Sequence, residues 1–182
     1  MKAWGKPRLL TGLLLAVVFV AARVPAQDGA LREYDVKAAC LFNFAKYSDW
    51  SPGSFSGPAA PLVIGVLGDD PFGLVLDRIV KGRVANNRPI TVRRADRVAD
   101  LAGAHIVFVS ATERARAAQI CGALDGSNVL TVGDTAETAP YCIVNFSVTG
   151  GKTVFSINLA RANRAGVKIS SKLLALAADV TR

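Results

Sequence analysis

The chain has 182 residues, of which 51% are hydrophobic, and its 22 Lys and Arg residues against 14 Asp and Glu residues give a formal net charge of +8. This length suits one domain that buries a sizeable core. The cations form no dense block along the chain, which argues against a nucleic-acid-binding protein.

The N-terminal 26 residues have the pattern of a cleaved secretory signal. Lys2, Lys6 and Arg8 precede Leu9–Ala22, an uncharged and mostly apolar run of 14 residues, and small residues lead up to Ala26. This pattern predicts cleavage after Ala26. The run is shorter than the roughly 20 residues that cross a bilayer as a helix, so an uncleaved anchor is the less favoured alternative.

We therefore expect residues 1–26 to be a signal peptide and residues 27–182 to be a single exported domain that does not itself span a membrane. The signal carries four cations and no acid, so its removal lowers the net charge from +8 to +4.

The first part of this domain predicts a helix followed by a buried strand. Leu31–Trp50 lacks Gly and Pro and is rich in apolar residues, which predicts a long helix that ends before Pro52. Leu62–Gly68 is a continuous apolar run, typical of a strand covered on both faces. Asp70 is expected to cap a helix whose first residue is Pro71.

The middle of the chain predicts an alternation of strands and helices. The expected strands are Arg88–Ala95, His105–Ala111 and Asn128–Asp134, and the expected helices are Arg97–Leu101 and Thr112–Leu124, the latter capped by Thr112. This alternation predicts an α/β fold with a mainly parallel, flavodoxin-like sheet, strand order 2-1-3-4 and helices on both faces.

The C-terminal part predicts a β-hairpin and short helices. Two alternating runs flank Gly150-Gly151 and place Thr149 opposite Lys152. In that register one apolar face contains Cys142, Val144, Phe146, Val148, Thr153, Phe155 and Ile157. Two short helices should follow, capped by Asn158 and Ser170, with Gly166 as a left-handed C-cap between them.

No catalytic constellation is evident. Ser170, Ser171 and Lys172 lack the serine–lysine spacing of a known hydrolase motif, and the sequence contains no G-x-S-x-G. The single histidine, His105, begins an apolar strand, which favours a structural role. We therefore predict a protein that is not an enzyme and has no catalytic residue, no cofactor and no metal site.

One loop and one basic cluster are candidate binding features. The loop contains Gly68, Asp69, Asp70 and Gly73 at the carboxyl end of the first strand, where open α/β sheets bind ligands; the alternative is a strand exit with a helix cap. The cluster contains Arg161, Arg164, Lys168 and Lys172 and forms either a solvated face or a partner surface.

Three cysteines remain in the exported domain, Cys40, Cys121 and Cys142. In an oxidising compartment two of them can pair, and the alternative is that all three are small buried hydrophobic residues.

Several segments of the chain resemble those of the YfiR-like family in the same order. They are VKAACLFNFAKYSDW near the start, VLGDDPFG after the first strand, LAGAHIVFVS and VLTVGD in the middle, and INLARANRAGVKISSKLLALA near the end. The resemblance covers nearly all of residues 31–178, and the combination is specific although each segment alone is not.

The resemblance implies a periplasmic, non-catalytic repressor of an inner-membrane diguanylate cyclase, acting through the periplasmic domain of that enzyme. Such a protein lowers cyclic-di-GMP signalling and biofilm formation, and redox or envelope stress relieves the repression. The alternative function is a periplasmic small-ligand-binding domain that uses the loop from Gly68 to Gly73. A homodimer is a further candidate arrangement.

The chain departs from the family at its cysteines. Family members often have one cysteine in the first strand and another just before the histidine of HIVFVS, where this chain has Ile64 or Gly65, and Ala104. Both are missing together, as expected for a pair. By comparison with the family, we expect Cys121 and Cys142 to form a disulfide in its place.

Overall fold

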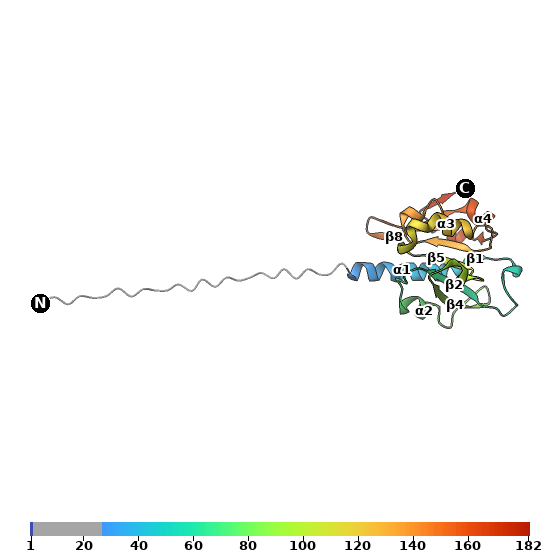
Figure 1. The fold of residues 1–182 in the computed structure, drawn as a ribbon, viewed down its shortest axis with the longest axis horizontal. Helices are drawn as coiled ribbons and strands as arrows, with labels where there is room; N and C mark the ends of the chain where they lie inside the picture. The colour runs from blue at the N-terminus through green and yellow to red at the C-terminus, as the bar shows by residue number, and fades with distance from the viewer. Residues whose placement is uncertain (2–26) are drawn as a thin grey trace.

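The computed structural model describes Met1 and residues 27–182, so the predicted signal peptide after Met1 lies outside the described residues. The described part is a mixed α/β fold around an eight-stranded sheet of order β10-β8-β7-β6-β5-β2-β4-β3, with a separate two-stranded sheet of β1 and β9. Helix α1 (Gln27–Lys46) runs between the half that contains α2 and β4 and the half that contains β8 (Figure 1). No helix of the described residues is long and apolar enough to cross a membrane.

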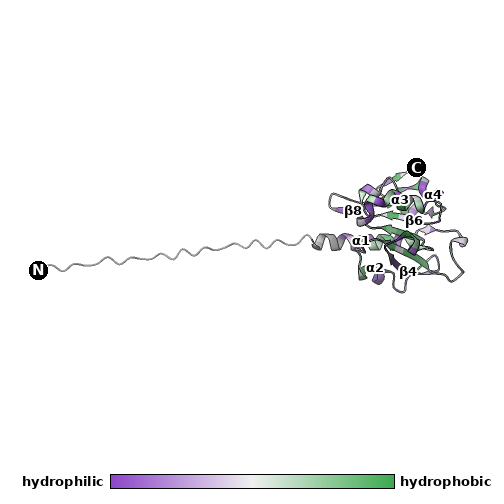
Figure 2. Ribbon diagram, viewed as in Figure 1, coloured by the Kyte–Doolittle hydropathy of each residue, from purple (hydrophilic) through white to green (hydrophobic). Residues whose placement is uncertain are grey.

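Five neighbouring strands of the sheet are parallel, because β7 (Val144–Thr149) also pairs parallel with β6, and the other four form the middle of the sheet. These four are β4 (Arg88–Ala95), β2 (Leu62–Leu67), β5 (Ile106–Val109) and β6 (Leu130–Gly133), side by side in that order. The predicted order 2-1-3-4 is therefore confirmed. Every residue of β2, β5 and β6 is buried, and these strands are the hydrophobic centre of the fold (Figure 2), as expected where layers cover both faces.

Alternate residues of β2 face two different core clusters. Ile64 and Val66 belong to the cluster that includes residues of α1 and α2 (Leu74–Val80). Val63 and Leu67 belong to the cluster that includes residues of the 3₁₀ helix η2 (Val98–Leu101) and of α3 (Ala117–Ala123). Helical segments thus cover both faces of the sheet.

Three predicted helix boundaries were wrong. Helix α1 ends at Lys46 rather than near Trp50, because Ser48–Asp49 forms β1 and pairs antiparallel with β9 (Lys168–Ile169). This pairing joins segments about 120 residues apart, so it cannot be predicted from the residues around the end of the helix. Two shorter helices also begin later than expected.

Helix α2 begins at Leu74 rather than Pro71. The Asp70 carboxylate accepts a hydrogen bond from the Phe72 amide at 2.8 Å, so it caps a turn ahead of the helix. The segment expected to be one helix from Thr112 is the 3₁₀ helix η3 (Ala111–Arg116) followed by α3. Thr112 does not cap it and instead accepts a hydrogen bond from the Asp69 amide.

Strands β7 (Val144–Thr149) and β8 (Lys152–Asn158) pair antiparallel, with Thr149 opposite Lys152. Gly150 and Gly151 both have positive φ, 57° and 73°, which the tight turn requires. Phe146 and Phe155 lie opposite each other on the core face. Cys142 does not share that face, contrary to expectation, because it precedes β7 and belongs to the cluster on the other side of the sheet.

The chain ends with two short helices and an added strand. In α4 (Leu159–Arg164) the Asn158 side chain caps the first turn, and Gly166, with φ of 72°, ends it. Ser170 caps α5 (Ser171–Leu174). Two short strands were not predicted from the sequence. They are β10 (Asp179–Thr181), which pairs parallel with β8, and β3 (Val84–Ala85), which pairs with the start of β4.

Candidate functional site

A buried ion pair lies at the carboxyl edge of the sheet, where α/β proteins place functional groups. Asp134 follows β6 and is 3% exposed, and Lys37 of α1 is 2% exposed. The Lys37 ammonium lies 2.6 Å from Asp134 Oδ1 and 2.6 Å from a carboxylate oxygen of Glu33, and it donates to the Asp134 carbonyl at 3.1 Å. One lysine thus binds two carboxylates and a backbone oxygen.

The second carboxylate oxygen of Asp134 is also satisfied. Asp134 Oδ2 accepts hydrogen bonds from the Tyr34 hydroxyl at 3.0 Å and from the Ala111 amide at 3.1 Å. Burial and the Asp134 charge raise the pKa of Tyr34, so its hydroxyl stays a donor. The Lys37 ammonium also lies 4.7 Å from the centre of the Tyr34 ring.

This network fastens α1 to the ends of β5 and β6. Each charged group in it has a partner within the chain, so the arrangement suits a rigid anchor rather than an acid–base site. Sequence reasoning missed it. The available signals were Lys37 within an otherwise apolar stretch of helix and Asp134 at the end of an apolar strand.

The candidate ligand loop is closely packed against its neighbour. Gly68 has φ of 84°, and a Cβ there would lie 2.9 Å from Thr112 Oγ1 and 2.8 Å from Glu113 Cγ. Only glycine fits both the conformation and the space. The Asp69 amide donates to Thr112 Oγ1 at 3.3 Å, which joins the ends of β2 and β5.

One of the two acidic side chains of this loop, that of Asp70, is neutralised from β4, whereas the Asp69 side chain is exposed. Arg94 Nε donates to Asp70 Oδ2 at 2.6 Å, and the same guanidinium donates to the Gly73 carbonyl at 2.9 Å and to Asp77 of α2. The hydrogen bond from Arg94 lowers the pKa of Asp77. The structure thus brings Gly68, Asp70 and Gly73 together, but Asp70 is used to hold the loop to the sheet.

His105 is a structural residue in this geometry. Its Nδ1 accepts the Val63 amide at 3.1 Å, and its Nε2 lies 3.1 Å from the Ser54 carbonyl, so the neutral Nε2–H tautomer satisfies both groups. The ring stacks on Phe55 at 4.2 Å and meets the edge of Trp50. Burial lowers the pKa of His105, which keeps the ring neutral.

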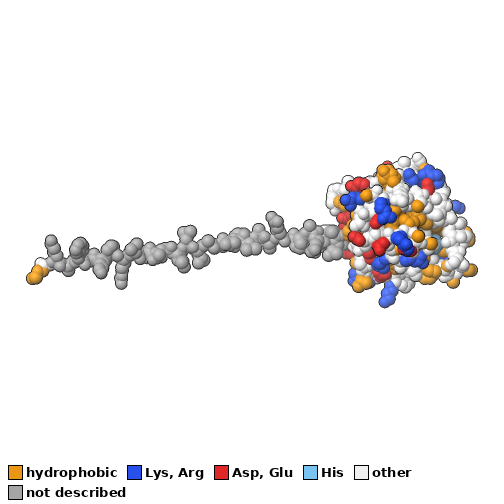
Figure 3. Space-filling model, in the orientation of Figure 1, with side chains coloured by type: hydrophobic (Ala, Val, Ile, Leu, Met, Phe, Trp, Pro, Cys, Tyr) orange, Lys and Arg blue, Asp and Glu red, His pale blue; other side chains and the backbone are white. Residues whose placement is uncertain are grey.

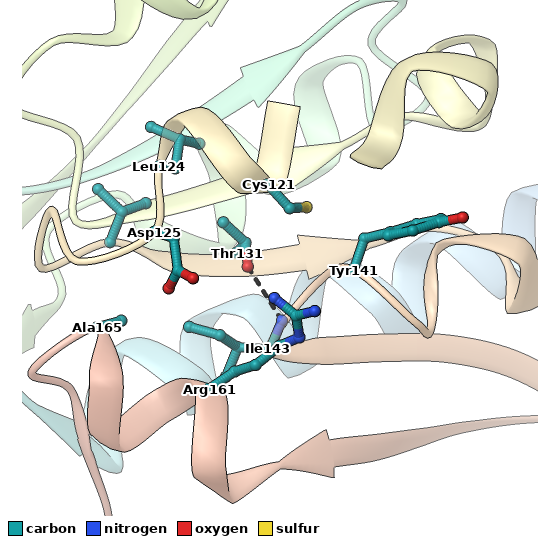
Figure 4. Close-up of a pocket in the computed structure, with 9 residues that line it drawn as sticks. Cys121, Leu124, Asp125, Thr131, Tyr141, Ile143, Arg161 and Ala165 are labelled. Atoms are coloured by element: carbon teal, nitrogen blue, oxygen red, sulfur yellow. Dashed lines mark hydrogen bonds between the residues drawn. The ribbon is translucent and has the colours of Figure 1, made fainter. Parts of the chain in front are cut away.

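The structure joins Cys121 of α3 to Cys142, which precedes β7, in a disulfide with Cα atoms 5.6 Å apart. Figure 4 shows the small pocket beside it, into which the Arg161 side chain extends from α4. Cys40 is the free cysteine, and burial raises the pKa of its thiol.

The four cations of the predicted basic surface lie along the C-terminal segment. Arg161 donates to the Pro140 carbonyl at 2.9 Å, and Arg164 Nε lies 4.0 Å from a carboxylate oxygen of Asp125. Lys168 in β9 and Lys172 in α5 are exposed. Two of the four are therefore engaged within the chain, and the other two are exposed.

Across residues 27–182, the structure shows no cluster of three or more His, Cys, Asp or Glu side chains that could hold a metal ion.

The fold and the disulfide together describe a mixed α/β domain suited to an oxidising compartment. The sequence profile of the YfiR/HmsC-like family matches residues 34–178, well over half of the chain, and the chain belongs to this family. The resemblance seen in the sequence is therefore confirmed.

Comparison with curated proteins gives no match. Among solved structures, a conserved domain protein from Vibrio cholerae O1 biovar El Tor is 13% identical with a TM-score of 0.48, over 65% of this chain and 54% of that one. An ABC domain in complex with L-Trp from Streptococcus pneumoniae is 9% identical with a TM-score of 0.48, over 84% of this chain and 60% of that one. The chain thus spans little more than half the length of either protein.

Proposed function

We propose that the protein is an exported, non-catalytic regulator that binds the periplasmic domain of an inner-membrane diguanylate cyclase and represses it. The observation that carries this proposal is the family match over residues 34–178. The characterised role of YfiR-like proteins is repression of such a cyclase, and the effect here would be lower cyclic-di-GMP signalling.

Several polar side chains are hydrogen-bonded or ion-paired within the chain, and this supports a binding role. Lys37 and Asp134 are buried and paired, Asp70 is held by Arg94, and His105 bridges two backbone groups. These residues, which could have carried acid–base chemistry, are thus engaged in holding the fold. A regulator needs such rigidity, because it must present one surface to its partner.

Repression of this kind shifts the equilibrium between the active and inactive conformations of the cyclase. The regulator must bind the inactive conformation of the cyclase more tightly than the active one. A tenfold shift needs only about 1.4 kcal/mol of differential binding, which a modest interface supplies.

The other functional predictions stay open. Small-ligand binding at Gly68, Asp69, Asp70 and Gly73 would have to compete with Arg94 for Asp70. A partner surface at Arg161, Arg164, Lys168 and Lys172 rests on exposed Lys168 and Lys172. The homodimer also stays a prediction.

A genetic test separates repression from these alternatives. Deletion of the protein in its own host should raise cyclic-di-GMP, and the full chain should restore the low level. A chain without residues 2–26 should not restore it, because it would stay on the wrong side of the membrane. Unchanged cyclic-di-GMP in the deletion strain would contradict the proposal.

A further inference from the structure

The outer edge of β4 is an unpartnered strand edge. On its inner side β4 pairs with β2 from Ile90 to Ala95. On its outer side β3 pairs only with Arg88 and Pro89, and the Ile90 amide then donates to the Arg83 carbonyl at 3.4 Å. Within residues 27–182, no strand pairs with the outer side of Thr91–Ala95.

The direction of the backbone groups follows from two hydrogen bonds. The Ile90 amide points outward to Arg83, and the Ala95 carbonyl points inward, where it accepts the Gly68 amide at 3.0 Å. Since backbone groups alternate along a strand, those of Val92 and Arg94 point outward. They form a short row of open donors and acceptors of the kind that takes up an added strand.

An apolar groove accompanies this edge. It has a volume of about 460 Å³ and lies between α2 and β4, lined on its apolar side by Leu74, Val80, Ile90 and Val92. Leu74 is 77% exposed. A strand added beside β4 would point every second side chain toward this groove. The open backbone and the groove therefore fit the same extended segment.

Exposed cations flank the groove. Arg78 and Lys81 line it and are exposed, and Arg93 is exposed on the strand, where it donates a hydrogen bond to the Ala102 carbonyl. Among the nearby acids, Asp70 and Asp77 are paired with Arg94, whereas Asp96, just after the strand, is exposed. In the space-filling view, Lys and Arg side chains lie among apolar and acidic ones over the half that contains α2 and β4 (Figure 3).

The exposed cations favour one of two binding partners for this edge, an acidic segment over a second copy of the chain. Two copies paired antiparallel through β4 about a two-fold axis near Arg93 would bring Arg93 of one copy opposite Arg93 of the other, and like charges across strands are destabilising. An acidic segment would instead complement the exposed cations Arg78 and Lys81 beside the groove.

We propose that the outer edge of β4, Thr91–Ala95, binds an extended acidic segment of a partner protein as an added strand, with apolar side chains of that segment in the groove beside Leu74. This inference deepens the proposed function and rests on it where the partner is the cyclase. The strand addition itself can be tested without the cyclase.

The first test uses a peptide probe. The full chain, isotope-labelled, is titrated with acetyl-Glu-Val-Glu-Val-Glu-amide and, separately, with the peptide in which Lys replaces Glu. The acidic peptide should shift the amide signals of Val92 and Arg94 saturably and slow their hydrogen exchange at least about tenfold. The basic peptide should do neither at the same concentration.

Variants make the test specific. Val92→Pro removes an outward N–H and leaves the ladder to β2 intact, so the fold should persist while peptide binding is lost. Arg78→Glu with Lys81→Glu keeps the backbone and should weaken binding of the acidic peptide at least about tenfold. Lys152→Glu, at the distant β7–β8 hairpin, is the control for a charge reversal away from the groove and should bind as the unchanged chain does.

The outcomes separate this inference from the proposed function. Absence of shifts at Val92 and Arg94, or equal binding by folded Val92→Pro, would overturn it. So would a dimer in sedimentation that Val92→Pro abolishes, because the occupant would then be a second copy. If the cyclase domain crosslinks equally to Val92→Pro, this surface is wrong and the function stands. If the peptide binds and no cyclase is captured, the surface stands and the proposed function fails.

Discussion

Because Lys37 is paired with buried Asp134, we expect substitution of Lys37 to cause a large loss of stability. Lys37→Met leaves Asp134 buried without its cation, which typically costs about 3–5 kcal/mol of unfolding free energy. Urea unfolding followed by circular dichroism measures this. Glu33→Gln is the control and should cost much less, because the Glu33 side chain is 30% exposed.

A double variant tests whether the cost arises from the pair itself. Lys37→Met combined with Asp134→Asn should destabilise less than the sum of the two single changes, since neither charge is then left alone. Additive effects would show that the two residues are not coupled, contrary to the 2.6 Å contact.

His105 predicts a pH dependence of stability. Burial lowers its pKa from the ordinary value of 6.5, so the unfolded chain binds a proton more readily than the folded one. The stability from neutral His105 is therefore complete above about pH 6.5 and is lost as the pH falls toward the lower folded pKa. Because the chain has one histidine, His105→Gln should flatten the slope of melting temperature between pH 7 and pH 5. An unchanged slope would assign it to other groups.

For single residues, the sequence predicted the contacts between residues that are close together in the chain. The caps Asn158 and Ser170 bond to amides three residues ahead, so local spacing reveals them. The contact between Lys37 and Asp134 spans 97 residues, and its partners meet only after the sheet has formed. Nothing in the residues around either one specifies the other.

Among the elements, α4 depends on a cap whose removal has a defined cost. Asn158 Oδ1 accepts the Arg161 amide at 2.9 Å. Asn158→Ala should lower the unfolding free energy by about 1 kcal/mol, while Asn158→Asp should retain the cap. Chemical denaturation of both variants measures the difference. Equal loss in both would show that the cap does not stabilise α4.

The disulfide joins α3 to the segment before β7, and its sequence separation is 21 residues. A loop of this length predicts about 3 kcal/mol of stabilisation, lost on reduction. Mass spectrometry of the unreduced, denatured protein should find one alkylated thiol, that of Cys40. Three alkylated thiols would show that the pair does not form in solution.

Element order was more predictable than element length. Continuous apolar runs and the alternation of strands with helices indicate a parallel sheet of order 2-1-3-4, because crossovers have a fixed hand. Strands β1, β3, β9 and β10 have two or three residues each, too few for a pattern. The end of α1 depends on the pairing of β1 with β9, which is a tertiary event.

For the whole molecule, the family can be read from sequence, whereas the binding surface cannot. The matched segments include capping residues and core residues such as Leu41 and Phe44, which are fully buried and so define the fold. The open edge of β4 appears only when the sheet is assembled, because it depends on where β3 stops. Arg93 and Arg94 look like ordinary surface cations until their strand is placed at that edge.

A crosslinking capture in the native host tests directly whether the protein binds a membrane-bound diguanylate cyclase. The tagged full chain is exported, crosslinked in the periplasm and recovered with its membrane partners, which are identified by mass spectrometry. We expect capture of a membrane protein that has a periplasmic domain and a diguanylate cyclase domain. Recovery of folded, exported protein without any such partner would contradict it.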